Sequence, residues 1–193
     1  MFQLQTPNVV HPIGNEKLEK FESRRGEPIV PSKEAHVSDV APFSFEENAT
    51  GKFLVARRTI AAGTLLVSNP GTIRTLPDMH TFQSDDATHV DCAEPGIVRF
   101  FNHSCAPNAR ILISADPAEV SLEASSEIQP GEVICWDYCT SEWDMESPFD
   151  CTCGAATCRG RVQGFKWMTA AQRAAVNQAS ISTYILARAE RAI

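Results

Sequence analysis

The spacing of apolar and polar residues differs between two parts of this chain. Between residues 51 and 136, short apolar runs alternate with polar turns that contain glycine or proline, the pattern typical of short β-strands. The strands predicted from this pattern are Phe53–Ala56, Thr64–Val67, Thr88–Cys92, Ala109–Ser114 and Glu119–Ala124. After residue 168 the apolar positions take a helical spacing instead. The pattern therefore predicts a mainly β fold with some α-helix.

One sequence pattern of apolar residues and a glycine occurs twice in the β-rich part. Leu54, Ala56, Ile60, Gly63 and Leu66 match Leu122, Ala124, Ile128, Gly131 and Ile134 without a gap. Each copy predicts a strand, a glycine turn and a second strand. Two such units indicate two similar corners of a small β-fold, and their long period excludes a solenoid.

The two ends of the chain differ from this middle part. Residues 1–45 hold five of the twelve prolines and predict an extension with one short helix at Glu16–Arg25, which either wraps the domain or is loosely ordered. At the other end, Thr169 and Gln172 predict a capping box. The helix it starts would run to about residue 190, with an apolar stripe at Ala175, Ala179, Ile181, Ile185 and Leu186 that packs on the domain or on a partner.

Composition and charge narrow the classes of function. The 193 residues are 43% hydrophobic, enough for a real core, and no apolar run approaches the roughly 20 residues that span a membrane. The first residues lack the pattern of a secretory signal, so we expect an intracellular protein, in the nucleus or cytoplasm. A net charge of −7 argues against direct nucleic-acid binding and suits a cationic partner such as a lysine-rich peptide or a small amine.

Seven cysteines fall into two groups. Cys105 is followed later by Cys151, Cys153 and Cys158, and four thiolates are what a closed tetrahedral zinc site needs. Gly154 and Gly160 permit the tight loop that this spacing requires. The alternative is four buried or free thiols. The other three, Cys92, Cys135 and Cys139, lie in apolar, strand-like settings and are expected to be small core residues.

Two further motifs carry candidate chemistry. Asn102-His103 lies between an apolar Phe-Phe pair and the expected zinc ligand Cys105, so a metal would clamp the C-terminal segment over it and build a pocket. Tyr138 closes an apolar run at Gly131–Tyr138 and could point its hydroxyl into a cleft. Taken alone, His103 could equally be an ordinary histidine in a turn, and Tyr138 could equally be a core tyrosine whose hydroxyl has a partner.

Together these segments resemble the SET-domain family of lysine methyltransferases. Arg99–Asn108, reading RFFNHSCAPN, is similar to that family's R-F-x-N-H-S-C-x-P-N signature, and Gly131–Tyr138 is similar to its strand ending in Asp-Tyr. Cys151–Gly160 resembles the post-SET zinc loop, and Ile60–Thr64 resembles an early family stretch. The resemblance divides the chain into an N-terminal extension (1–45), a SET domain (46–146), a post-SET zinc loop (147–165) and a C-terminal helix (166–193).

The resemblance also implies a fold and a site. The fold would be β-clip-like, with small sheets tied by a pseudoknot, and S-adenosyl-L-methionine would be the methyl donor for a lysine that enters from the opposite face. Tyr138 would be the catalytic residue, and Cys105, Cys151, Cys153 and Cys158 would hold Zn²⁺. Cofactor-binding residues would be Lys52, Phe53, Arg99, Asn102, His103 and Tyr138, and the substrate channel would be lined by Phe82, Phe101 and Trp136.

Three departures from the family pattern keep other functions open. Gly51-Lys52-Phe53 has only the first glycine of the family's G-x-G, Trp136 stands where phenylalanine or tyrosine is usual, and the stretch 75–90 has Phe82 as its only aromatic residue. The leading interpretation is methyl transfer to a protein lysine. The alternatives are the same chemistry on a small amine or metabolite, and a degenerate SET module that binds a peptide or protein.

Overall fold

A computed structural model describes residues 41–48, 51–92 and 96–191. The predicted N-terminal helix Glu16–Arg25 lies outside these residues. The strands are β1 (Phe43–Asn48), β2 (Gly51–Ala56), β3 (Leu65–Pro70), β4 (Thr72–Arg74), β5 (Thr81–Gln83), β6 (His89–Asp91), β7 (Asn102–His103), β8 (Ala109–Ala115), β9 (Ala118–Ala124), β10 (Cys135–Trp136), β11 (Phe149–Asp150) and β12 (Arg161–Val162). The helices are α2 (Ala170–Ala175) and α3 (Thr183–Arg191), with 3₁₀ turns η1 (Ile97–Phe100), η2 (Tyr138–Thr140), η3 (Phe165–Trp167) and η4 (Gln178–Ser180).

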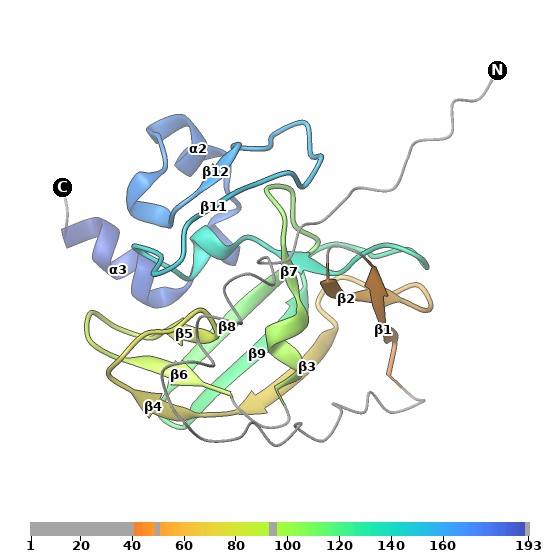
Figure 1. Ribbon diagram of the computed structural model, residues 1–193, viewed down its shortest axis with the longest axis horizontal. Helices are drawn as coiled ribbons and strands as arrows, with labels where there is room; N and C mark the ends of the chain where they lie inside the picture. The colour runs from red at the N-terminus through yellow and green to blue at the C-terminus, as the bar shows by residue number, and fades with distance from the viewer. Residues whose placement is uncertain (1–40, 49–50, 93–95, 192–193) are drawn as a thin grey trace.

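The strands form several small sheets, which confirms the predicted mainly β fold. Two three-stranded sheets have the orders β3-β9-β8 and β4-β6-β5, and β1-β2, β10-β7 and β11-β12 form two-stranded pairs. Figure 1 shows β11, β12, α2 and α3 gathered on one side of the molecule, with α3 beside the β4-β6-β5 sheet. The C-terminal segment thus returns to the β-rich part.

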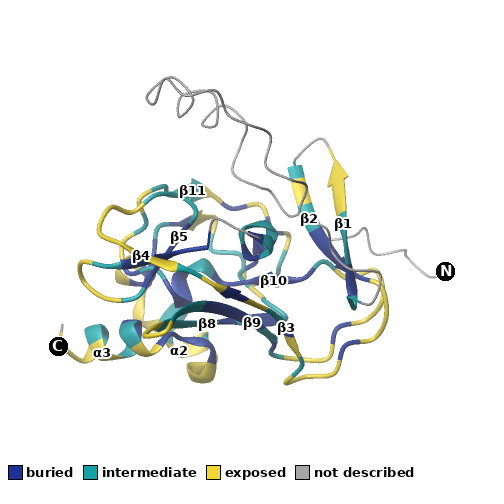
Figure 2. Ribbon diagram, turned by 90° about the horizontal axis from the view of Figure 1, so that it is seen from below, coloured by how far each residue is buried: buried dark blue, intermediate teal, exposed yellow. Residues whose placement is uncertain are grey.

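The central strands supply the core. Val120, Leu122 and Ala124 of β9 are fully buried, and they alternate along the strand as one face of a pleated sheet must. Figure 2 shows buried segments of β8 and β9 at the centre, while α2 and α3 keep exposed faces. Cys92, Cys135 and Cys139 are buried, as the apolar settings of these three thiols predict.

The two copies of the repeated sequence pattern form backbone hydrogen bonds with each other. Ile60 and Ile128 form an antiparallel bridge, and the Gly63 amide donates to the Ala124 carbonyl at 2.8 Å. Gly63 and Gly131, which match in the repeat, have φ of 80° and 85°. An L-residue with a side chain is strained in this region, so glycine is needed at both turns. The two similar corners that the repeat predicted therefore meet in one junction.

A parallel pair joins the Asn-His segment to the strand before Tyr138. In β7 and β10, Asn102 lies opposite Cys135 and His103 lies opposite Trp136. The Asn108 side chain extends this contact, because its Oδ1 accepts from the Cys135 amide at 3.0 Å and its Nδ2 donates to the Val133 carbonyl at 2.9 Å. The pairing brings two motifs more than thirty residues apart into one site.

The C-terminal helix differs from its prediction. Thr169 and Gln172 do form the capping box, but α2 ends at Ala175, and Val176 is extended. The Asn177 side chain then accepts from the Ala179 amide and starts η4, a local hydrogen bond that competes with helix continuation. Ile181 and Ile185 are buried, whereas Ala175 and Ala179 are exposed. The single stripe through residue 190 was therefore wrong, and α3 starts a new direction.

Helix α3 is fixed to the turn between β5 and β6. Asp86 in this turn accepts a hydrogen bond from the Tyr184 hydroxyl at 2.9 Å and forms ion pairs with Arg188 and Arg191. The Arg188 guanidinium also lies 4.9 Å from the centre of the Trp143 ring. Among the described residues, no helix has the length and apolar character needed to cross a membrane.

Candidate active site

A cavity of about 840 Å³ opens where β2, β5, η1, β10 and η2 meet. Its volume lies in the range of small-molecule and cofactor sites. The sequence-predicted residues that line it are Lys52, Phe82, Arg99, Phe101, Asn102, Trp136 and Tyr138. Two predicted cofactor residues, Phe53 and His103, are not among its lining. Phe53 follows Lys52 in β2, and neighbouring residues of a strand point to opposite faces.

Tyr138 holds its hydroxyl at the inner wall of this cavity. The hydroxyl donates to the Phe101 carbonyl at 3.1 Å, and this carbonyl oxygen of Phe101 also accepts from the Trp136 indole N–H at 3.3 Å. Burial raises the pKa of the Tyr138 phenol well above its usual value, and the Cys135 thiol adds to the shift. The hydroxyl therefore stays protonated at neutral pH, and it can act as a dipole but not as a base.

Asn102 and His103 are both buried but serve different contacts. The Asn102 Nδ2 donates to the Lys52 carbonyl at 3.2 Å and so ties the start of β2 to the site. The His103 Nδ1 accepts from the Tyr138 amide at 3.2 Å, and its Nε2 lies 3.2 Å from the Cys105 sulfur. Burial lowers the pKa of His103 to about 4, against the opposing effect of Asp137. His103 is thus neutral, with its proton on Nε2 facing the thiol.

An ion pair that the sequence reasoning missed lies behind His103. Asp137 Oδ2 accepts from the Arg159 guanidinium at 2.8 Å, and the side chains are 3% and 7% exposed. Asp137 Oδ1 also lies 3.6 Å from the His103 Nδ1 and accepts from the Cys139 amide at 3.1 Å. A fork-shaped contact of this kind fixes orientation as well as charge. It therefore links the cysteine loop to the turn that carries Tyr138.

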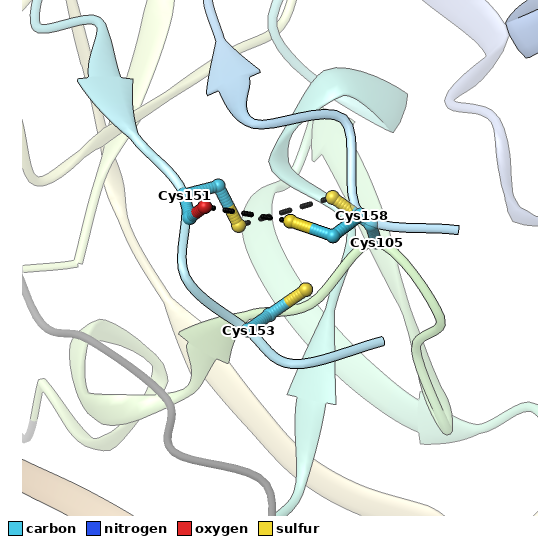
Figure 3. Close-up of side chains that lie close together, drawn as sticks. All are labelled: Cys105, Cys151, Cys153 and Cys158. Atoms are coloured by element: carbon cyan, nitrogen blue, oxygen red, sulfur yellow. Dashed lines mark hydrogen bonds between the residues drawn. The ribbon is translucent and has the colours of Figure 1, made fainter. Parts of the chain in front are cut away.

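The four predicted zinc ligands come together. The Cys105, Cys151, Cys153 and Cys158 sulfurs all lie within 4.8 Å of one another, and those of Cys105 and Cys151 are 3.9 Å apart. Figure 3 shows the four side chains converging from the loop after β7 and from the segment between β11 and β12. Tetrahedral zinc with bonds of roughly 2.3 Å places its sulfurs roughly 3.8 Å apart. The donor set and its spacing therefore fit a zinc ion.

Glycines make the cysteine loop possible. Gly154 and Gly160 have φ of 72° and 70°, in the left-handed region that favours glycine. The Cys151 amide donates to the Gly160 carbonyl at 2.7 Å, which closes the loop between β11 and β12. The predicted need for a tight loop at these two positions is confirmed.

Arg99 was predicted from the sequence, whereas other polar residues of the cavity carried no such signal. Arg99 is held by Asp91, with its Nη2 2.7 Å from the carboxylate, and Asp91 also pairs with Arg74. The cavity lining also includes His80, Gln83 and Glu142. Lone polar residues in a polar stretch cannot be separated from a solvated surface by sequence pattern alone, and only the fold turns these toward the cavity.

Comparison with known proteins identifies the domain that builds this site. The sequence model of the SET domain matches residues 51–139, which include β2, Asn102, His103 and Tyr138. Residues 51–139 form a SET domain. This SET domain contains all of the predicted cavity-lining residues named above, and the cysteines at positions 151, 153 and 158 follow it in sequence.

The SET domain has relatives among fungal proteins and solved structures. A histone-lysine N-methyltransferase of Schizosaccharomyces pombe, H3 lysine-4 specific, is 41% identical over 86 residues, 43% of this chain and 9% of the relative. Methyltransferase flvH of Aspergillus flavus is 34% identical over 71 residues, 37% of this chain and 39% of the relative. The chain thus spans less than a tenth of the first relative and about two fifths of the second.

Two crystal structures share the fold. One is KRYPTONITE in complex with mCHG DNA and SAH, with 27% identity, a TM-score of 0.51, and coverage of 62% of this chain and 29% of that chain. The other is KRYPTONITE in complex with mCHH DNA, an H3(1-15) peptide and SAH, with 25% identity and the same TM-score and coverage. The matched fold extends over more of the chain than the sequence matches do.

Proposed function

We propose that this protein transfers a methyl group from S-adenosyl-L-methionine to the ε-amine of a lysine in a protein substrate. The observation that carries the proposal is the cavity of the SET domain, with the Tyr138 hydroxyl at its inner wall. Methyl transfer to lysine is supported by the histone-lysine N-methyltransferase relatives. S-adenosyl-L-methionine as the methyl donor is supported by the SAH complexes of KRYPTONITE. We further infer that the four-cysteine cluster binds zinc, because its donor set and spacing fit that ion.

The residues of the cavity suit this chemistry. The methyl donor supplies a sulfonium-bound methyl group, and the lysine nitrogen must meet that carbon in line with the sulfur. Positioning of this kind can lower a barrier by several kcal/mol. Tyr138 lines the cavity, and its hydroxyl oxygen can polarise the methyl through a weak C–H···O contact, because the hydroxyl donates its own proton to the Phe101 carbonyl. Asn102, Lys52 and Arg99 are proposed to hold the donor, with Phe82, Phe101 and Trp136 around the lysine.

A cationic substrate also matches the excess of acidic side chains in the cavity lining. Asp78, Asp86, Asp144 and Glu146 line the cavity, where Lys52 and Arg99 are the lysine and arginine, within a chain of net charge −7. An acidic opening attracts lysine-rich segments and repels nucleic-acid phosphates. Such a substrate would be met in the nucleus or the cytoplasm.

Methyl transfer to a small amine is the second candidate. The observation that favours it is the similarity to flvH, of which this chain covers 39%, whereas it covers 9% of the first histone-lysine relative. The name of flvH states a methyltransferase and does not name a histone substrate. A degenerate binding module is the third candidate, because Phe53 replaces the second glycine of the family motif.

Two assays separate the three candidates. Calorimetry with S-adenosyl-L-methionine should give saturable binding with one site per chain, and absence of binding would favour the degenerate module. Transfer of a tritiated methyl group is then measured with histones, a cell lysate and a panel of small amines. Label on histone or lysate protein supports the leading proposal, and label only on small amines supports the second.

Replacing Tyr138 with Phe should lower the rate of methyl transfer at least roughly tenfold, about 1.4 kcal/mol in activation free energy. The reason is that only the hydroxyl at the Phe101 carbonyl is lost, while the ring contacts with Trp136 and His103 remain. Steady-state kinetics measure the rate, and circular dichroism should be unchanged.

The second tyrosine of the chain provides the matched control. Tyr184→Phe removes a hydroxyl that contacts Asp86 outside the inner wall of the cavity, and a much smaller change in rate is expected. Equal turnover of the Tyr138→Phe variant and the wild type would remove Tyr138 from the catalytic role.

A further inference from the structure

The Glu142 carboxylate lies in the same cavity, within one turn of Tyr138. Its backbone amide donates to the Tyr138 carbonyl at 3.1 Å, so η2 fixes its position relative to the hydroxyl. Its Oε1 accepts from the Gln83 amide at 3.2 Å, and the Gln83 side chain in turn accepts from the Trp143 amide at 2.9 Å. The carboxylate is therefore held between η2 and β5 and is not free to swing into solvent.

Glu142 differs from the other carboxylates of the cavity. Glu47, Asp86, Asp144 and Glu146 are exposed, Asp144 is paired with Lys166, and the half-buried Asp78 accepts from the His80 amide. Glu142 is enclosed by protein, although its side chain keeps some contact with the cavity, and no ion pair joins it to a lysine or arginine among the described residues. Burial raises the pKa of its carboxyl to about 8, against the opposing contact from the Gln83 amide. A cation arriving in the cavity would stabilise the charged form.

Other titratable groups surround this carboxylate on every side. They include Tyr138 from η2, Tyr184 and Arg188 from α3, Asp144 and Glu146 from its own segment, Lys52 from β2, Arg99 from η1, and Asp78, His80, Asp86 and His89 from the β5–β6 side. Burial lowers the pKa of His80 and of His89, so both are neutral at pH 7 and above. Arg188 is engaged by Asp86 and the ring of Trp143.

The proposed reaction leaves one proton without a destination. A lysine in water has a pKa near 10.4 and arrives as an ammonium, but only the neutral amine has the lone pair that attacks carbon. The Tyr138 hydroxyl is already protonated and donates to Phe101. His103 does not line the cavity, and its Nδ1 is occupied by the Tyr138 amide. Neither group can take the proton.

We propose that Glu142 is the general base that accepts this proton from the substrate ammonium. One N–H bond of the ammonium breaks and an O–H bond forms on the carboxylate. The amine lone pair then forms the new N–C bond as the C–S bond of the donor breaks, which leaves a methylated ammonium and the neutral thioether. The proton on Glu142 returns to water through the open side of the cavity. This assignment rests on the proposed function and adds the residue that activates its nucleophile.

The test is a pH profile of kcat/KM for the wild type and Glu142→Gln, with histone H3 residues 1–15 as substrate and a tritiated methyl donor. The wild type needs ionised Glu142 while the amine is still an ammonium, so its profile should rise up to about pH 8 and then level off, because above roughly pH 10 the amine is already neutral and needs no base. The variant needs a free neutral amine, so its rate should keep rising toward pH 10. It should be at least roughly tenfold slower at neutral pH and approach the wild type at high pH.

Glu127→Gln, an exposed glutamate outside the cavity, is the matched control and should reproduce the wild-type profile. Overlapping profiles for Glu142→Gln and wild type would overturn the assignment. A deficit of Glu142→Gln that is equal at all pH values would overturn it as well, because it would indicate a structural role.

A binding arm keeps the test independent of turnover. Calorimetry compares the H3 peptide with the same peptide carrying norleucine in place of every lysine, on wild type and on Glu142→Gln. The wild type should prefer the lysine peptide at neutral pH, and the variant should lose that preference. If the wild type methylates neither proteins nor amines, the proposed function fails. Whether or not the wild type methylates anything, an equal preference for the lysine peptide in the wild type and in Glu142→Gln would reject contact between Glu142 and the ammonium.

Discussion

Cys153→Ser is expected to release the metal and to lower the affinity for S-adenosyl-L-methionine by at least roughly a hundredfold, about 2.7 kcal/mol. The four sulfurs lie within 4.8 Å of one another, so one missing ligand opens a site that is otherwise closed. The loop from residue 151 to residue 158 would then lose its attachment to Cys105, which lies two residues from His103 and contacts its ring. Structural zinc sites commonly supply part of the folding free energy, so the melting temperature should fall too.

Elemental analysis and calorimetry measure this prediction together. The wild type should carry one zinc per chain and should lose both metal and donor affinity with a strong chelator. Cys92→Ala is the matched control, because Cys92 is buried in the main core away from the cluster. It should lower stability and keep the zinc. A wild type without stoichiometric metal, or a Cys153→Ser variant with unchanged donor affinity, would contradict the clamp.

Asp137→Asn is expected to lower the free energy of unfolding by about 3–5 kcal/mol. The substitution keeps the shape of the side chain but leaves the buried Arg159 guanidinium without its counter-charge. Removal of one partner of a buried pair is costly because the other charge stays desolvated. Tyr138 adjoins Asp137, and the His103 ring lies 3.6 Å from it, so transfer activity should fall as well.

Urea unfolding of single and double variants isolates the cause of this loss. Asp137→Asn combined with Arg159→Met should be less destabilised than Asp137→Asn alone, because no unpaired charge remains. Glu123→Gln breaks the more exposed pair with Arg110 and should cost less than about 1 kcal/mol. A cost of that small size for Asp137→Asn would contradict the importance of the buried pair.

Local chemistry made several features predictable. The glycines at 63, 131, 154 and 160 take left-handed backbone, and the Thr169–Gln172 capping box forms, because each depends on a few adjacent residues. Alternation located the β8–β9 hairpin within a residue or two of its ends. The predicted helix to residue 190 was wrong because helical spacing of apolar residues does not record the competing bonds of Asn177.

The candidate site divides in the same way. Spacing of cysteines predicted a metal cluster, because ligand number and residue type are written in the chain. Phe53 and His103 were expected at the cofactor, and the structure places neither in the cavity lining. Strand alternation turns Phe53 away from the face of Lys52, and the pairing of β7 with β10 buries His103 behind Tyr138.

The sequence by itself determined the mainly β class, the turn glycines, the four sulfur ligands and the resemblance to SET domains. Each of these follows from residue type at short spacing. Only the tertiary structure brought Glu142 to Gln83, Arg159 to Asp137 and the two repeat copies to each other. These contacts join residues separated by 22 to 68 positions. Such contacts depend on how the whole chain packs, and no local pattern records it.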